Sequence, residues 1–433
     1  MRNRTAKIVN DPVHGFITLP TGLLLDLINH PWLQRLRRIK QLGLTEYVYP
    51  GALHTRFHHA LGAMHLMDLA LETLSSKGHD ISPDEWEAAK AAVLLHDVGH
   101  GPFSHALEYT ILTNVDHEQI TLLVMQQLVQ ELGGNMGVAL QMFNDTYPRP
   151  FFHQLISGQL DVDRLDYLAR DSFFTGVIEG GVASQRIIKM LNLVNDNLVV
   201  EEKAIYSIEN FLVARRLMYW QVYLHKTTVS TEQMLVQLLR RARHLFAEGV
   251  PLQLADPLAH FFHPTTLLSP DEVPRITPND LQSSQAPAWL AHFLLLDDID
   301  IWAAIKRWAR HPDLVLSELC KALLERKLFK VLISDKPFDW ERSTSMLPLG
   351  PADLVVQSAD IPYLLCTGEI NNTTYFAGAN NIRILTKSGQ VKDIMTASDA
   401  PHVQAMDNAV TKYYLCRHPR LTQGSILDAQ ALS

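Results

Sequence analysis

The sequence is poor in cysteine, short of basic charge and free of long hydrophobic runs. Its 433 residues contain three cysteines with no C-x-x-C spacing, which does not fit a disulfide framework and favours a reducing compartment. Acidic residues outnumber basic ones by 46 to 38, a balance that argues against nucleic acid as a primary partner. Neither an apolar leader nor a stretch of about 18 apolar residues occurs, so we expect a cytoplasmic protein without a membrane partner.

Most of the first half has the apolar periodicity of helices. Residues 82–85 (Ser-Pro-Asp-Glu) offer an N-cap serine, a proline at the first helical position and a glutamate for a capping box, so we expect a helix from there to Asp97. Helical patterns also cover 117–133, 153–174 and 208–246. The first half is therefore expected to be mainly α-helical.

The composition changes at 264–287, where five prolines interrupt any regular element. Beyond this stretch, two helical segments are followed by short β-branched segments and by an expected closing helix at 403–416. We therefore expect a mainly α domain at 1–262, a Pro-rich linker at 263–290 and a smaller C-terminal α+β domain at 291–433.

Histidines cluster in the first quarter of the chain. Nine of the 20 fall between His54 and His117, which favours a functional site over chance. Within this window, the run from His96 to His105 reads His-Asp-Val-Gly-His-Gly-Pro-Phe-Ser-His. Three imidazoles and a carboxylate beside a glycine-marked turn are typical of a hydrolytic metal centre. For His54 itself, a hydrogen-bonded core position is the preferred interpretation.

The candidate metal ligands come from three parts of the sequence. Adjacent His96 and Asp97 point about 100° apart on a helix, yet at a helix end both can reach one ion. Two ligands do not close a site, and the candidates for the others are His59 and Asp163. Two imidazoles and two carboxylates with open positions suit one divalent ion, such as Mn, Fe, Mg or Zn, acting on phosphate.

His105 and Glu108 form a candidate catalytic pair. They lie three residues apart and so share a helix face. A carboxylate there can orient the imidazole and favour its protonated form, as a general acid requires. An exposed pair without a catalytic role fits the spacing equally well. His117, followed by Glu118, repeats the pattern with less specificity.

Six motifs, in this order along the chain, resemble the HD-superfamily deoxynucleoside triphosphate triphosphohydrolases. The resemblance covers residues 7–230 and implies a mainly α-helical HD fold. The motifs are Asp11-Pro-Val-His-Gly15, Gln34-Arg-Leu-Arg-Arg-Ile-Lys-Gln-Leu-Gly43, Tyr49-Pro-Gly51, Arg56-Phe-His-His59, the run 96–105 and Asp161-Val-Asp-Arg-Leu-Asp-Tyr-Leu-Ala-Arg-Asp171.

The resemblance also implies a role for each matching position. The four candidate ligands would bind one metal ion, and Gln41 and Leu42 would lie against the sugar, where a close apolar contact can exclude a 2′-hydroxyl. Phosphate contacts would come from Arg56, His100, Arg164 and Tyr167. Further sugar and phosphate contacts would come from Asp171, Arg215 and Tyr223. His105 would lie at the leaving-group oxygen, supported by Glu108, with His117 nearby.

Three positions depart from the family pattern. Arg164 replaces the lysine of better-known members, which changes a point charge into a planar fork. Tyr219, one turn after Arg215, stands where those members have a histidine. Asn29 corresponds to the aspartate that reads guanine in the regulatory site of the vertebrate enzyme, and an amide presents a donor where a carboxylate presents only acceptors.

An effector site is a further expectation from the resemblance. Lys7, Asn10, Gln34 and Arg37 keep the polar character of the corresponding segment. A nucleotide effector therefore stays among the expected partners, but its base preference should differ because of Asn29.

The expected function is metal-dependent hydrolysis of deoxynucleoside triphosphates (dNTPs) to deoxynucleoside and inorganic triphosphate, by a homo-oligomer (dimer or tetramer). One alternative is an HD phosphohydrolase acting on a nucleoside monophosphate, a cyclic nucleotide or an alarmone. Another is a catalytically silent nucleotide-sensing scaffold. Gln41 and Leu42 favour the first function, because a sugar-reading element would be superfluous on a generic phosphatase. The complete ligand set speaks against the scaffold.

Overall fold

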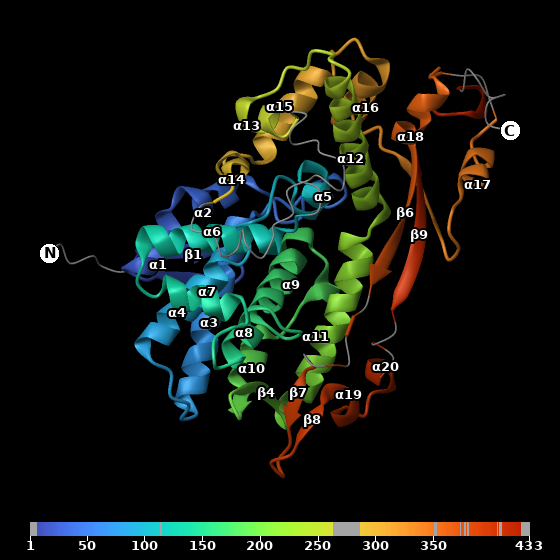
Figure 1. The fold of residues 1–433 in the computed structure, drawn as a ribbon. Helices are drawn as coiled ribbons and strands as arrows, with labels where there is room; N and C mark the ends of the chain where they lie inside the picture. Colours follow the sequence, from blue (N-terminus) through green and yellow to red (C-terminus); the bar gives the residue numbers. More distant parts are fainter. Residues whose placement is uncertain are drawn as a thin grey trace.

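The computed structural model describes residues 7–112, 115–262, 286–349, 353–372, 374–375, 378, 381–404, 406 and 409–425. These residues form a mainly α-helical body with small sheets at its periphery, which confirms the predicted fold class (Figure 1). None of the helices in these ranges is long and apolar enough to cross a membrane. The expected linker at 263–290 lies mostly outside the described residues.

The helical body is organised around α3, which is buried along most of its length and packs against α4 and α9. An antiparallel hairpin of β1 (Lys7–Asp11) and β2 (Gly15–Leu19) precedes it. The helices are α1 (Leu23–Asn29), α2 (Pro31–Arg35), α3 (Arg56–Ser76), α4 (Pro83–Leu95), α5 (Glu108–Ile111), α6 (His117–Leu132), α7 (Met136–Phe143), α8 (Phe151–Ile156), α9 (Val162–Thr175), α10 (Ser184–Lys189), α11 (Ile205–Met218), α12 (Lys226–Ala247) and α13 (Asp256–His260).

The predicted capping box at the start of α4 is confirmed. The Ser82 side chain accepts a hydrogen bond from the Glu85 N–H, and the Glu85 carboxylate accepts one from the Ser82 N–H at 2.8 Å. The helix ends at Leu95, and the chain then turns through Gly99. A Cβ on Gly99 would lie 2.2 Å from the His117 carbonyl oxygen, so only glycine lets α6 approach this turn.

Two segments predicted as continuous helices are interrupted. In 153–174, α8 stops at Ile156 and α9 starts at Val162, after Asp161 has capped its N-terminus. In 208–246, a π-helical turn at Tyr219–Tyr223 separates α11 from α12. The first interruption places Asp163 in the first turn of α9, and the second leaves an irregular turn, a feature often found at functional sites.

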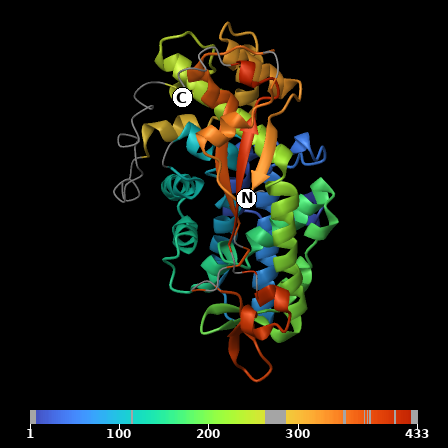
Figure 2. The ribbon, with the colours of Figure 1, turned by 90° about the vertical axis from the view of Figure 1, so that its right-hand side faces the viewer.

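The C-terminal part packs along α12 and at both ends of the helical body (Figures 1 and 2). One sheet has the strand order β5-β9-β6, and in the other β7 pairs in parallel with β4. The elements are β3 (Leu191–Val194), β4 (Asn197–Glu201), α14 (Ala288–Phe293), α15 (Asp298–Trp308), α16 (Leu314–Leu324), β5 (Lys330–Ser334), α17 (Trp340–Ser345), α18 (Ile361–Leu364), β6 (Leu365–Asn372), β7 (Arg383–Leu385), β8 (Val391–Asp393), α19 (Ile394–Ala397), α20 (Pro401–Gln404) and β9 (Val410–Arg417).

The predicted closing helix at 403–416 is wrong. The second half of this segment belongs to strand β9, which lies between β5 and β6 as the central strand of its sheet. Its sequence, Val-Thr-Lys-Tyr-Tyr-Leu-Cys-Arg, is rich in the β-branched and aromatic residues that favour strands. Pairing with two distant strands therefore reinforced a local preference that the helical interpretation overlooked.

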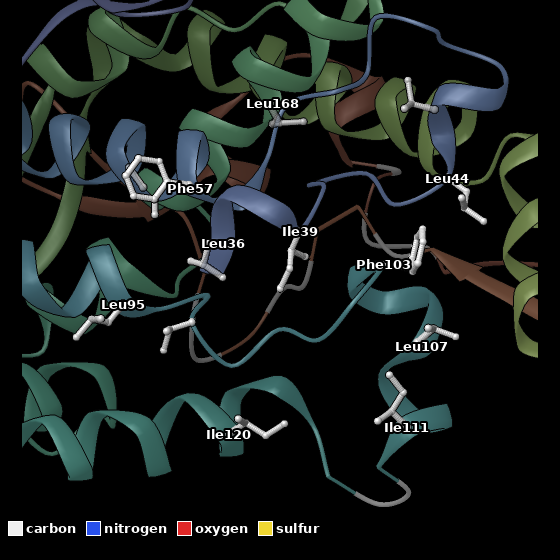
Figure 3. Packing of buried hydrophobic residues seen from close by; sticks show 14 of the residues in the cluster. Leu36, Ile39, Leu44, Phe57, Leu95, Phe103, Leu107, Ile111, Ile120 and Leu168 are labelled. Carbon is white, nitrogen blue, oxygen red and sulfur yellow. The ribbon is translucent and has the colours of Figure 1, made fainter. Parts of the chain in front are cut away.

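A shared hydrophobic core supports the segment that follows His96. Figure 3 shows Phe103, Leu107 and Ile111 of this segment among residues from other elements, including Ile39 and Ile120, and all five are buried. The segment that follows His96 is therefore fixed to the hydrophobic core by its own apolar side chains.

Candidate metal centre and active site

Three predicted ligands converge at the centre of the helical body. His59 comes from α3, His96 from the C-terminal end of α4 and Asp163 from the first turn of α9. The His59 Nε2 lies 3.2 Å from the His96 Nε2 and 3.1 Å from an Asp163 oxygen, and the His96 Nε2 lies 3.5 Å from the same oxygen. Ligands held about 2.0–2.2 Å from one ion have separations of this size.

The remaining ring nitrogens of both histidines are engaged elsewhere. His59 Nδ1 lies 2.7 Å from the Asp166 carboxylate, and His96 Nδ1 lies 2.6 Å from the Val93 carbonyl oxygen. Both Nδ1 atoms therefore donate, which leaves each Nε2 lone pair directed at the shared point. This is the usual arrangement of metal-binding histidines, and the three residues can hold a divalent ion.

Asp97, the fourth predicted ligand, borders the same point. Its two oxygens lie 3.6 Å from the His59 Nε2 and 3.5 Å from the His96 Nε2. The carboxylate also pairs with the Arg56 guanidinium and lies 3.3 Å from the His100 Nε2. It is thus placed to bind the ion while these two side chains fix its orientation.

The electrostatic field at this centre favours a cation. Burial alone lowers the pKa of His59, but hydrogen bonds to Asp163 and Asp166, together with the charge of Asp97, raise it to about 10. Carboxylates that stabilise a buried imidazolium this strongly also stabilise a metal ion at the same position. Ligand types, spacing and field therefore all fit a divalent metal.

A buried ion-pair network behind His59 was not predicted. The Asp166 carboxylate accepts hydrogen bonds from His14 at 2.6 Å, from His59 at 2.7 Å and from Arg170 at 2.9 Å, and Arg170 also reaches Asp11 at 2.8 Å. Asp166 lies one turn after Asp163, so the helical spacing offered a signal. His14 gave no such signal, because it lies 152 residues before Asp166 and only the tertiary structure brings the two side chains together.

The catalytic cluster predicted around His105 is also assembled. Glu108 lies 2.9 Å from the His105 Nδ1 and 2.5 Å from the His117 Nδ1, and it also accepts the His117 backbone N–H. The His117 ring stacks on His100 with centroids 3.9 Å apart. One carboxylate therefore orients two imidazoles beside the metal centre.

Protonation states in this cluster follow from burial and charge. Burial alone raises the pKa of Glu108, but hydrogen bonds from His105 and His117 outweigh it and hold the pKa well below its usual value. Burial and the Arg56 guanidinium hold the pKa of His100 well below its ordinary value. Glu108 is thus a carboxylate and His100 a neutral imidazole, whereas the His105 side chain is two-thirds exposed, toward solvent.

The predicted sugar-contacting pair lies next to the N-terminus of α3. Lys40 forms an isolated β-bridge with Thr55, and the Gln41 N–H donates to the His54 carbonyl oxygen at 3.0 Å. Among the described residues, the buried Gln41 Oε1 has no hydrogen-bond partner. Leu42 is partly buried against the core. An amide oxygen is thus left available beside the helix that carries His59.

The predicted phosphate side is formed by α9, α11 and the π-helical turn. Tyr167 contacts Tyr223, and the Tyr223 hydroxyl donates to Asp171 at 2.7 Å. Arg164 pairs with Asp161, while Arg215 is buried, and its Nε and Nη1 atoms have no partner among the described residues. A buried guanidinium with unused donors is suited to an anionic ligand.

Asp171 and His54 contact each other. The Asp171 carboxylate accepts from the His54 Nε2 at 2.7 Å as well as from Tyr223. The hydrogen-bonded core position expected for His54 is confirmed, since the ring is buried and stacks on Phe174.

A cavity of about 250 Å³ adjoins the metal centre. Four of its lining residues are candidate site residues, and the others lie on α6, on α8 and the residue that follows it, and in the 143–145 segment. The lining comprises His96, Asp97, His117, Glu118, Leu122, Phe143, Asn144, Asp145, His153, Ile156, Ser157 and Asp163.

The predicted effector residues lie on the N-terminal elements. Lys7 and Asn10 are exposed on β1, and Asn29, at the end of α1, donates its amide to the Leu25 carbonyl oxygen at 2.8 Å. Gln34 accepts from the Arg37 guanidinium at 2.8 Å, which joins two of the five.

The geometry is that of a site able to hold a divalent metal ion, and comparisons with known proteins place this site in an HD domain. The HD domain model matches residues 56–171, and the HD associated region model matches residues 182–249. A solved phosphohydrolase from Bacteroides thetaiotaomicron is 47% identical, with a TM-score of 0.85, over 95% of this chain and 100% of its own. The protein YwfO of Bacillus subtilis is 31% identical over 90% of this chain and 88% of its own.

Deoxynucleoside triphosphate triphosphohydrolases are among the more distant relatives. The SAMHD1 homologue of Dictyostelium discoideum is 28% identical over 59% of this chain, and chicken SAMHD1 is 28% identical over 55%. This chain spans 52% and 46% of these two proteins, about half the length of each. The chain belongs to the HD superfamily of phosphohydrolases, in which it is similar to the dNTP triphosphohydrolases.

Proposed function

We propose that this protein hydrolyses dNTPs to a deoxynucleoside and inorganic triphosphate. The observation that carries the proposal is the pairing of the Lys40–Gln41 segment with the N-terminus of α3. This pairing puts the Gln41 amide and the Leu42 side chain beside the helix that supplies His59. A phosphatase without sugar selectivity has no use for such an element.

The metal centre and the basic residues would divide the work on the triphosphate. His59, His96, Asp97 and Asp163 would hold a divalent ion, which when bound would supply Lewis-acid polarisation of a phosphate and a lowered pKa of water. Arg215, whose buried Nε and Nη1 atoms have no hydrogen-bond partner in the described part of the chain, would bind phosphate oxygens and offset their charge.

The leaving-group step falls to His105. Water attacks the α-phosphorus, the bond from phosphorus to the 5′-oxygen breaks, and the 5′-oxygen needs a proton. Glu108 holds the His105 Nδ1 at 2.9 Å, so the Nε2 of that ring is the proton donor. His117 shares the same carboxylate and restricts its movement.

The metal identity, the assembly and the effector site are also proposals. Manganese, iron, magnesium and zinc all suit two imidazoles and two carboxylates, and we propose manganese as the first ion to test. We further propose a homo-oligomer, a dimer or tetramer, with a nucleotide effector near Lys7, Asn10, Gln34 and Arg37. The Asn29 amide already donates to the Leu25 carbonyl oxygen within α1, so we propose that the effector nucleotide carries a base other than guanine.

The function is tested by incubating the protein with Mn²⁺ and each dNTP, singly and in pairs, and measuring inorganic triphosphate. Triphosphate release that disappears in His96→Ala supports the proposal. Release of pyrophosphate or monophosphate instead contradicts the assigned bond cleavage. Leu42→Gly should loosen the preference for dNTPs over ribonucleotides, and an unchanged preference would exclude the sugar role of Leu42.

A further inference from the structure

Asp298, at the start of α15, is a buried carboxylate that joins two distant segments of the active site. It is 4% exposed. One oxygen accepts the Phe103 N–H at 2.7 Å, and the other accepts the Lys40 N–H at 2.9 Å. Burial raises the pKa of Asp298 to about 6, so at neutral pH the group is ionised and both oxygens act as acceptors.

Each of these two backbone contacts lies close in sequence to a residue of the proposed mechanism, His105 in one case and Gln41 in the other. Phe103 precedes His105 by two residues, and Lys40 precedes Gln41. The two segments also contact each other, because the Ser104 hydroxyl donates to the Lys40 carbonyl oxygen at 3.0 Å. Asp298 therefore binds the backbone at Lys40 and at Phe103, two segments that are already adjacent.

The turn at Phe103 needs such support. Phe103 and Ser104 have φ values of 55° and 54°, a left-handed conformation that is costly for residues with side chains. Two such residues in succession persist only where their surroundings hold them. Asp298 supplies a charged acceptor for the Phe103 N–H, and Trp302 of the same helix contacts the Phe103 ring with centroids 5.8 Å apart.

Arg35 connects the junction between α14 and α15 with the segment that precedes Phe103. This fully buried guanidinium donates to the Leu296 carbonyl oxygen at 2.6 Å and to the His100 carbonyl oxygen at 2.8 Å. Leu296 lies two residues before Asp298, so two charged side chains connect the α14–α15 junction with residues 98–103. The α14–α15 junction thus supports the backbone of residues 98–103, which lead to His105.

We propose that Asp298 is a positioning residue whose carboxylate sets the spacing between the proton donor His105 and the sugar-reading segment at Gln41. The roles of those two segments rest on the proposed function. Among the described residues the carboxylate contacts the N–H groups of Lys40 and Phe103 and no metal ligand. Its loss should therefore affect turnover and sugar selectivity together and leave the metal in place.

The decisive variant is Asp298→Asn, with Asp300→Asn as its matched control. The amide keeps one acceptor oxygen and turns an NH2 group toward an N–H donor, so one segment must be released. Asp300 belongs to the same helix and caps it by accepting the Asp297 N–H at 3.0 Å. We expect kcat to fall roughly 10- to 100-fold in Asp298→Asn, as a misplacement of about 1 Å does. KM should change little, and the Asp300 variant should keep wild-type turnover.

Two further readouts separate positioning from general destabilisation. The ratio of dATP to ATP hydrolysis should fall in Asp298→Asn while the manganese content stays at the wild-type level. Amide hydrogen exchange should accelerate in the peptides 98–107 and 37–44 and stay unchanged in α3. The proposal is overturned if Asp298→Asn keeps the turnover, the sugar preference and the exchange rates of the wild type. It is also overturned if amide exchange accelerates throughout the variant and manganese is lost.

The design also separates this inference from the proposed function. If the wild-type protein releases no triphosphate from any dNTP, the proposed function fails, and the exchange measurement alone decides whether Asp298 holds both segments. If Asp298→Asn does not fold, Asp298→Glu replaces it, since it keeps two acceptor oxygens on a longer side chain. A Glu variant with wild-type exchange in both peptides would overturn the spacing role.

Discussion

Gly62 allows α3 and α9 to approach closely enough to build the metal centre, and replacing it with alanine tests this packing. A Cβ at Gly62 would lie 1.9 Å from an Asp166 carboxylate oxygen and 2.2 Å from the Arg170 Nη2. An ordinary contact needs at least 3.4 Å, so the carboxylate must retreat by about 1.5 Å. That carboxylate is held by His14, His59 and Arg170.

The expected magnitude follows from these contacts. A hydrogen bond to a charged group contributes about 1.5–3 kcal/mol, and a retreat of this size breaks two of them. The gain in helix propensity from glycine to alanine is about 1 kcal/mol. Gly62→Ala should therefore lower the free energy of unfolding by about 3 kcal/mol. It should also weaken metal binding roughly 10- to 100-fold, because the Nδ1 of His59 loses its partner.

Denaturant unfolding and a Mn²⁺ titration measure both effects. Gly137→Ala in α7 is the matched control, since its Cβ would meet nothing within 4 Å, and it should leave metal binding unchanged and slightly raise stability. If Gly62→Ala matches this control in stability and in Mn²⁺ affinity, the packing argument is refuted.

Three further predictions concern single side chains. Asp166→Asn should weaken Mn²⁺ binding roughly 10- to 100-fold in a metal titration, since one amide cannot accept from all three of its partners; equal affinity would exclude the network from metal binding. Tyr223→Phe should reduce stability by about 1 kcal/mol in denaturant unfolding through loss of its hydroxyl bond to Asp171, and an unchanged midpoint would count against that bond. The lowered pKa of Glu108 means that its stabilising contribution is present above its unfolded value of about 4.5 and is lost as the pH falls further. Glu108→Gln should therefore be less stable than wild type at pH 7, with the gap closing in acid, and a pH-independent gap would contradict the assignment.

Local chemistry made several features predictable. The capping box at Ser82 depends on four consecutive residues, and the ligands His96 and Asp97 are adjacent. Their distant partners were found only because the motifs around His59 and Asp163 resemble a known family. The sequence therefore revealed the types of ligand, whereas the 3.1–3.5 Å separations come from the packing of three helices.

Features that depend on long-range contacts were missed. Asp166 is 152 residues from His14, and nothing near either residue indicates their contact. Strand β9 is a different case, because its β-branched and aromatic residues favour a strand locally, and only its pairing with β5 and β6 depends on distant segments. Asp298 was not singled out either, because its function depends on backbone N–H groups at Lys40 and Phe103.

The bond from Arg35 to the Leu296 carbonyl oxygen spans 261 residues and has a consequence for biosynthesis. The ribosome releases the helical body before Leu296 and before β7, the strand that covers the open edge of β4. Until then the Nε of Arg35 lacks its acceptor, although the guanidinium can already donate to His100, and the edge of β4 stays unpaired; both are costly in a compact state. The nascent helical body therefore cannot reach its final packing before Leu296 and β7 have been synthesised, and a chain released before that point would expose a strand edge that promotes aggregation.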